Sequence, residues 1–129
     1  MLKREEILQA NDLVFEDVEV PEWGGTVRVR CLTAAERDAF EATILKQTQS
    51  GVRVEMSNLR AKLCAMTIVD EDGNRMFSDA EAELLGKKSA SALQRIFEVA
   101  MRLSRFTQSE IDALADNLKN APHGGSLIG

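Results

Sequence analysis

The sequence of 129 residues contains three capping boxes, a pattern that starts α-helices. Each box pairs a serine or threonine with a glutamate three residues later: Thr33 with Glu36, Ser78 with Glu81, and Thr107 with Glu110. The hydroxyl accepts a hydrogen bond from the backbone amide three residues on, and the carboxylate accepts one from the amide of the cap residue. Three helices are therefore predicted to begin just after these residues.

Apolar residues at helical spacing give the extent of these helices and predict two more. The predicted helices cover residues 34–49, 58–69, 79–86, 90–104 and 108–119. The clearest apolar stripe lies in 90–104 and consists of Leu93, Ile96, Phe97, Ala100 and Met101. We expect this helix to be central to the core. Residues 1–11 also favour a short helix, since Ile7 and Leu8 follow a charged stretch.

Residues 14–32 have a period of two instead, which is typical of strands. Two alternating runs flank a turn signal at 21–25 that contains proline and two glycines, so this segment is predicted to be a β-hairpin. Its polar face is expected to set the acidic Asp17 and Glu19 across from the basic Arg28 and Arg30.

These elements predict a mainly α protein with a small N-terminal β-hairpin and a compact domain of about five helices. Because the length is that of one ordinary domain, residues 1–120 are predicted to form a single domain. Residues 121–129 contain three glycines and a proline after the last helix and are predicted to be a flexible tail.

Charge and hydropathy exclude several classes of partner. A net charge of −5 repels phosphate backbones and anionic membrane surfaces, so neither nucleic acid nor a membrane is an expected partner. A helix-turn-helix from residues 90–103 and 108–119 would present Glu110, Asp112 and Asp116 to DNA, which is electrostatically unfavourable. No apolar run approaches the roughly 18 residues of a membrane span. The chain has two cysteines, Cys31 and Cys64, and no recognisable signal segment, so we expect two buried thiols in a reducing cytosol. A disulfide between them is the alternative.

The sequence lacks the residues that catalysis normally requires. The only histidine, His123, lies in the predicted tail, and neither cysteine belongs to a CxxC motif. GxSxG, Walker A, GxGxxG and HExxH motifs are absent as well. We therefore expect a protein that is not an enzyme and uses no cofactor.

One segment has nearly the spacing of an EF-hand calcium loop. Its oxygen ligands at positions one, three, five and twelve would be Asp70, Asp72, Asn74 and Glu81. The loop needs glycine at its sixth position, where this chain has Arg75. A tight turn followed by a serine-capped helix is the favoured interpretation, and no metal site is predicted.

Protein partners are the remaining class, and six residues are candidates for partner binding: Trp23, Arg28, Arg30, Met56, Met76 and Phe77. Tryptophan and arginine are enriched at protein interfaces, and exposed apolar side chains can receive a partner helix. The alternatives are that the apolar four belong to the core and that the arginines pair with the neighbouring strand.

Four segments, in order, resemble one family: VEVPEWGG at 18–25, LTAAERDAFE at 32–41, IVDEDGNR at 68–75 and SASALQRIF at 89–97. This is the family of tail assembly chaperones of long-tailed siphovirus bacteriophages, and the resemblance extends from about Val18 to Leu118. It rests on the order and spacing of the segments, since none of them is a catalytic signature.

The resemblance implies an assembly factor of the host cell cytoplasm that is absent from the mature virion. Such chaperones bind the tape measure protein, keep it soluble and extended until the tail tube assembles around it, and coat it with many copies. A longer form made by ribosomal frameshifting recruits the tail tube protein, and this chain would be the short form. Suitable codons at Leu118, Lys119 and Asn120 would provide the slippery site. The alternative is a phage structural component such as a head-tail connector or minor tail protein.

Overall fold

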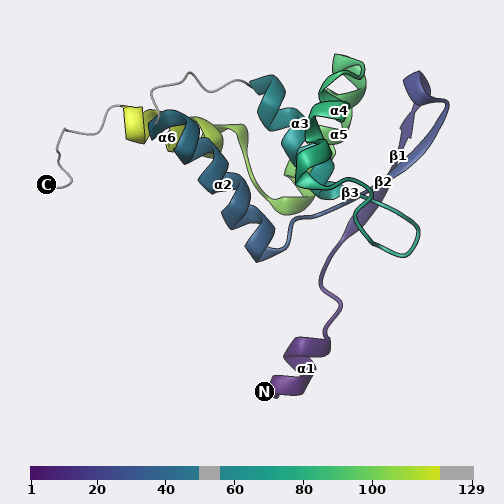
Figure 1. Cartoon of the computed structure of the whole chain (residues 1–129). Helices are drawn as coiled ribbons and strands as arrows, with labels where there is room; N and C mark the ends of the chain where they lie inside the picture. The colour runs from purple at the N-terminus through teal and green to yellow at the C-terminus, as the bar shows by residue number, and fades with distance from the viewer. Residues whose placement is uncertain (50–55, 120–129) are drawn as a thin grey trace, which may run out of the picture.

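A computed structural model describes residues 1–49 and 56–119, and the side chains of residues 1–46 and 58–116. Within these residues the secondary structure is mainly α, with a small three-stranded antiparallel sheet (Figure 1). The elements in chain order are α1 (Arg4–Gln9), β1 (Phe15–Val20), the 3-10 turn η1 (Pro21–Trp23), β2 (Gly25–Arg30), α2 (Ala34–Gln49), α3 (Met56–Thr67), β3 (Ile68–Val69), η2 (Asp79–Glu81), α4 (Ala82–Gly86), α5 (Ala90–Ser104) and α6 (Gln108–Lys119). This confirms the predicted fold class.

The helix predicted at 58–69 is wrong at both ends. It begins at Met56 and ends at Thr67. Ile68 and Val69 leave the helix and pair with Val29 and Arg28 of β2 as a third strand. These two β-branched residues satisfy backbone groups of β2 that a two-stranded hairpin would leave unpaired.

The predicted hairpin is confirmed, but only one of its two expected charge pairs forms. Asp17 lies opposite Arg28, which donates two hydrogen bonds to its carboxylate at 2.8 and 3.1 Å. Glu19 lies opposite Thr26, at the other end of the hairpin from Arg30. Arg30 lies opposite Phe15, so Glu19 and Arg30 do not take part in the expected cross-strand charge pairing.

Two of the capping boxes show the full reciprocal pattern. The Glu36 amide donates to Thr33 Oγ1 at 3.1 Å and the Thr33 amide donates to the Glu36 carboxylate at 2.9 Å. In the same way, the Glu110 amide donates to Thr107 Oγ1 at 3.2 Å and the Thr107 amide donates to the Glu110 carboxylate at 3.0 Å. In the third box, the Ser78 amide donates to Glu81 at 2.9 Å, and the helix begins with the 3-10 turn η2.

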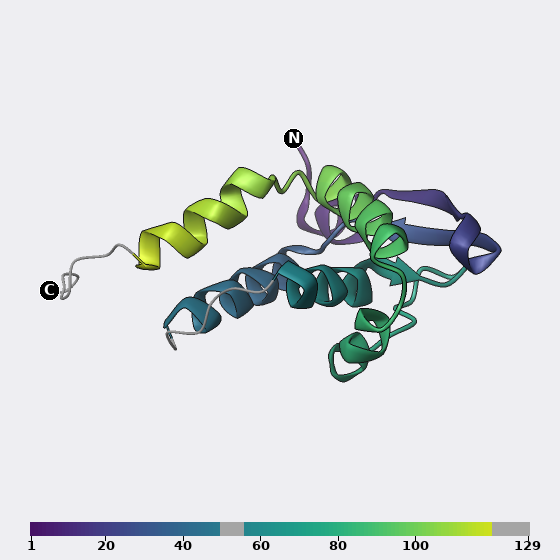
Figure 2. The same cartoon turned by 90° about the horizontal axis from the view of Figure 1, so that it is seen from above.

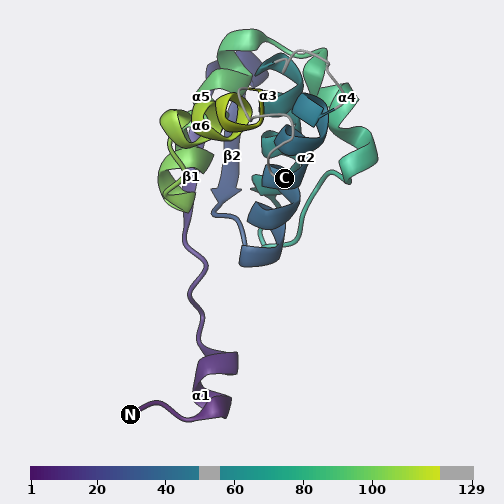
Figure 3. The ribbon, with the colours of Figure 1, turned by 90° about the vertical axis from the view of Figure 1, so that its left-hand side faces the viewer.

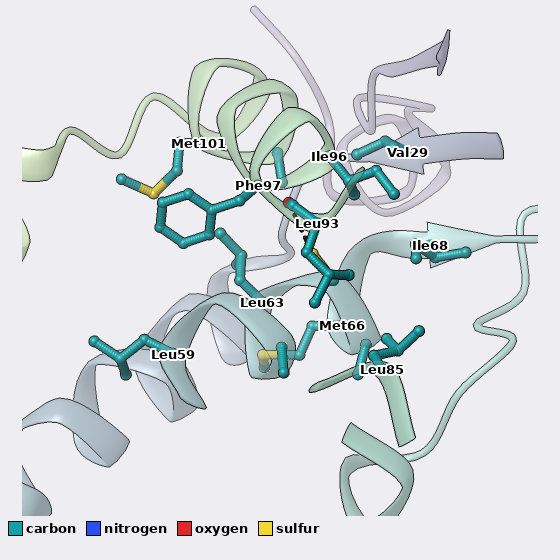
Figure 4. Packing of buried hydrophobic residues seen from close by; sticks show 14 of the residues in the cluster. Val29, Leu59, Leu63, Met66, Ile68, Leu85, Leu93, Ile96, Phe97 and Met101 are labelled. Carbon is teal, nitrogen blue, oxygen red and sulfur yellow. Dashed lines mark hydrogen bonds between the residues drawn. The ribbon is translucent and has the colours of Figure 1, made fainter. Parts of the chain in front are cut away.

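The helices form two layers, with α5 and α6 in one and α2 and α3 in the other (Figure 2). Helix α5 packs on both the hairpin and α3, as expected for the most amphipathic segment. In the core, side chains of α5 meet side chains of α3, α4 and the sheet, as Figure 4 shows for Ile96, Leu63, Leu85, Val29 and Ile68. Helices α2 and α6 pack against each other and continue the same core through the buried Phe40, Ile44 and Ile111.

The N-terminal arm, residues 1–14, stands apart from these layers (Figures 1 and 3). It contains α1, which confirms the short helix expected within residues 1–11, followed by an extended segment that leads into β1. Every residue of the arm is exposed. None of the helices in the described residues is long and apolar enough to span a membrane.

Candidate functional site

A hollow of about 840 Å³ lies beside the sheet and is here named the hairpin hollow. Its apolar lining comes from Trp23 and Val27 of the hairpin, from Val69 of β3, and from Met76 and Phe77 in the segment that follows. Strand β3 pairs with only two residues of β2, and the hollow opens where this short ladder ends. The hollow therefore lies beside the short third strand, whose residues Ile68 and Val69 line it.

Four of the six candidate residues line this hollow: Trp23, Arg28, Met76 and Phe77. Met76 is 57% exposed, whereas Trp23 and Phe77 are partly buried and pack against the core. Arg28 is held by Asp17 on the rim, and the hydrogen bond from Arg28 lowers the pKa of that carboxyl. The sequence thus identified residues from two distant segments that meet at one surface.

The other two candidates are not at this site. Arg30 donates to both carboxylate oxygens of Glu36 at 2.7 and 2.8 Å and to the Cys31 carbonyl at 3.1 Å, and its side chain is only 13% exposed. Arg30 therefore joins the start of α2 to the sheet, and this contact stabilises the fold. The side chain of Met56 lies outside those that the structure describes.

An ion pair between the hairpin tip and α5 positions Trp23. Glu22 accepts hydrogen bonds from Arg95 at 2.7 and 3.1 Å and from the Ser91 hydroxyl at 2.7 Å. Gly24, with a φ of 72°, ends the 3-10 turn in the left-handed conformation that glycine adopts at little cost. The indole Nε1 of Trp23 is buried and has no hydrogen-bond acceptor in the described part of the chain.

The Glu22 pair makes a pH-dependent contribution to stability. The hydrogen bonds from Arg95 and then Ser91 lower the pKa of Glu22 from 4.5 to about 2. A lowered pKa in the folded state stabilises the protein above the unfolded-state pKa, and that stability is lost as the pH falls toward the folded-state pKa. Between about pH 4.5 and 2, we therefore expect the wild type to lose more unfolding free energy than Glu22→Gln. Urea unfolding across this range measures the difference, and an NMR titration of Glu22 with an ordinary midpoint would contradict it.

The segment from Asp70 to Asn74 is the turn that the sequence favoured. Asp70 Oδ1 accepts hydrogen bonds from the amides of Asp72 and Asn74 at 2.9 and 3.0 Å, and Gly73 has a φ of 85°. Arg75, at the position where an EF-hand needs glycine, pairs with Asp79 at 2.8 Å. The turn directs the chain back along β3, where the Met76 amide donates to Ile68.

The described Cys, Asp and Glu side chains form no metal-binding group, and the two cysteines are buried. Across residues 1–49 and 56–119, no three His, Cys, Asp or Glu side chains are grouped so that they could hold a metal ion. Cys31 and Cys64 are both buried and free, and burial raises the pKa of the Cys64 thiol to about 12. A thiol with this pKa stays protonated at neutral pH and is a poor nucleophile.

The second exposed apolar surface is the N-terminal arm, which the candidate residues did not include. Its exposed side chains include Leu2, Ile7, Leu8 and Val14, which are between 50% and 70% exposed. The sequence signal was present, since Ile7 and Leu8 are adjacent apolar residues in a helix too short to bury both. Whether Ile7 and Leu8 are exposed depends on where the arm lies relative to the domain. The spacing of apolar residues in the sequence does not give that position.

A scan against protein families matches residues 3–117 to the model described as phage tail assembly chaperone. Among curated proteins and solved structures, none matches this chain significantly. The family match includes the arm from residue 3, the hairpin hollow and all the helices through most of α6. The family is one of chaperones and not of enzymes. Because the match covers well over half of the chain, this protein belongs to the phage tail assembly chaperone family.

Proposed function

We propose that this chaperone binds the tape measure protein and keeps it soluble and extended while the tail tube assembles. One observation carries the proposal: the chain has a complete buried core and still exposes apolar side chains in the arm and the hairpin hollow. Grouped apolar side chains on a protein surface mark binding sites for other proteins. The four candidate residues in the hollow are proposed to form such a site.

The charge of the chain supports this role. A net charge of −5 keeps copies of the chaperone in solution while their apolar surfaces engage a partner. We propose that the chaperone acts in the host cell cytoplasm, self-associates and is absent from the virion. A longer frameshifted form would add contacts to the tail tube protein.

Co-expression with the tape measure protein of the same phage tests the proposal. We expect the tape measure protein to be soluble with this chain, to copurify with it, and to be insoluble without it. Met76→Asp should reduce the soluble amount, because it places a charge in the hollow, whereas Ala113→Asp on the exposed face of α6 should not.

A head-tail connector or minor tail protein is the alternative function. It predicts a fixed number of copies in purified tails and no effect on tape measure solubility. Mass spectrometry of purified virions separates the two functions, and finding the chain there without tape measure binding would replace the proposal.

A further inference from the structure

We propose that the N-terminal arm of one copy docks into the hairpin hollow of a second copy. This inference rests on the hollow being a protein-binding surface, as proposed above, and it assigns that surface to a second copy, so that Met76→Asp would act on the tape measure protein by weakening the association of the copies that coat it. Most of the large exposed apolar side chains of the described chain lie in the arm and at Phe15, which follows it, and the others are Met76 at the hollow and Leu84 on α4.

The arm needs a surface that its own domain does not supply. Helix α1 has six residues, and isolated helices shorter than about 12 to 15 residues are marginal in water. A local hydrogen bond of 2.8 Å, from the Lys3 amide to the Glu6 carboxylate, supports the start of this helix. None of its residues is buried. A helix of this length becomes stable by packing its apolar residues, and Ile7 and Leu8 are 58% and 66% exposed.

The hollow has the apolar surface that the arm lacks. Met76 and the partly buried Phe77 and Trp23 form its apolar part, and its volume of about 840 Å³ accommodates several aliphatic side chains. Inserting Ile7 and Leu8 there would remove exposed apolar surface from water on both copies, which favours association.

The charges of the two surfaces are complementary. Lys3 and Arg4 stand four residues before Ile7 and Leu8 and so on the same side of α1, whereas Glu5 and Glu6 fall on its other side, and Asp70 and Glu71 lie on the lining of the hollow. The Arg4 guanidinium pairs with the neighbouring Glu5 at 3.3 Å, with both side chains about three-quarters exposed. Opposite charges at the rim of an interface favour the encounter and set the orientation of the two partners.

The direction of the arm favours a second copy over the same chain. The arm leaves the domain at Phe15, whereas Trp23 lies at the far end of β1. Figures 1 and 3 show α1 extending away from the hairpin tip. Each copy then carries one arm and one hollow, so docking is head-to-tail and can continue from copy to copy. A row of linked copies suits the coating of a long protein.

Sedimentation of the full-length protein, without any tape measure protein, tests the association. We expect concentration-dependent dimers or larger species, and at least a tenfold weaker association in both Leu8→Asp and Met76→Asp. The exposed-site variant Ala113→Asp should associate like the wild type, and circular dichroism should show that all three variants are folded. A monomeric wild type, or an association that neither substitution weakens, overturns the proposal.

Disulfide trapping distinguishes a second copy from the same chain. Leu8→Cys and Met76→Cys, made as separate chains with different tags, should form a mixed disulfide dimer on oxidation. The native Cys31 and Cys64 are buried and do not compete. The control pair Leu8→Cys and Ala113→Cys should give no such dimer. The double variant Leu8→Cys/Met76→Cys should give a ladder of linked chains, whereas an internal disulfide or no disulfide overturns the proposal.

These measurements are independent of the proposed function. If the protein fails to solubilise the tape measure protein but forms arm-dependent oligomers, only the proposed function fails. If it solubilises the tape measure protein as a monomer, only the docking of the arm fails.

Discussion

Phe40→Ala should lower the free energy of unfolding by about 3 to 5 kcal/mol, because it deletes a fully buried aromatic ring and leaves a cavity. Phe40 lies on α2 with no exposed surface, and its ring meets Phe106 edge to face at a centroid distance of 5.8 Å. Phe106 lies between α5 and α6, so this contact joins α2 to the layer that α5 and α6 form.

Chemical denaturation followed by circular dichroism measures this effect, with Phe15→Ala as the matched control. Phe15 is 54% exposed at the start of β1, where its ring contacts the Arg28 guanidinium at 4.1 Å. Its truncation should cost less than about 1 kcal/mol, as for most exposed positions. Equal losses in the two variants would show that Phe40 does not hold the layers together as described.

Glu36→Ala should cost about 2 to 4 kcal/mol, because one carboxylate supports both a helix start and a poorly exposed arginine. Glu36 accepts the Thr33 amide at 2.9 Å and two hydrogen bonds from Arg30 at 2.7 and 2.8 Å. The side chains of Arg30 and Glu36 are 13% and 18% exposed. Removal of Glu36 leaves the guanidinium with little access to water and without its counter-charge.

The Ser78 box provides the control for this prediction. Glu81→Ala removes a similar cap at an exposed helix start, without a buried arginine, and should cost about 1 kcal/mol. The double variant Arg30→Met/Glu36→Gln removes both charges together and should recover part of the loss. If Glu36→Ala and Glu81→Ala are equally destabilising, the Arg30 contact contributes nothing beyond the cap.

The helix starts were predictable because a capping box is a local interaction. The hydroxyl and carboxylate at Thr33 and Glu36 lie three residues apart, and their hydrogen bonds form wherever the helix packs. The same holds for the hairpin, whose turn at 21–25 and alternating apolar residues set its register. The apolar stripe of α5 likewise predicted its central place in the core.

The sequence indicated individual candidate residues for partner binding, but not that four of them line the same hollow. Trp23 and Met76 are 53 positions apart, and nothing local indicates that they line one hollow. The residue types were informative, since exposed aromatic and apolar side chains are suited to binding proteins. Their convergence required β3, which was predicted as the last turn of α3.

Local hydrogen bonds and apolar periodicity are encoded within a few residues, so the sequence by itself determined the presence of the helices, the starts of those with capping boxes, the hairpin and the mainly α class. The partner of Arg30, the strand pairing of Ile68 and Val69, and the exposure of the arm depended on the tertiary structure. In each case the outcome followed from competition between distant segments for the same backbone group, charge or apolar surface. That competition is resolved only when the chain is folded.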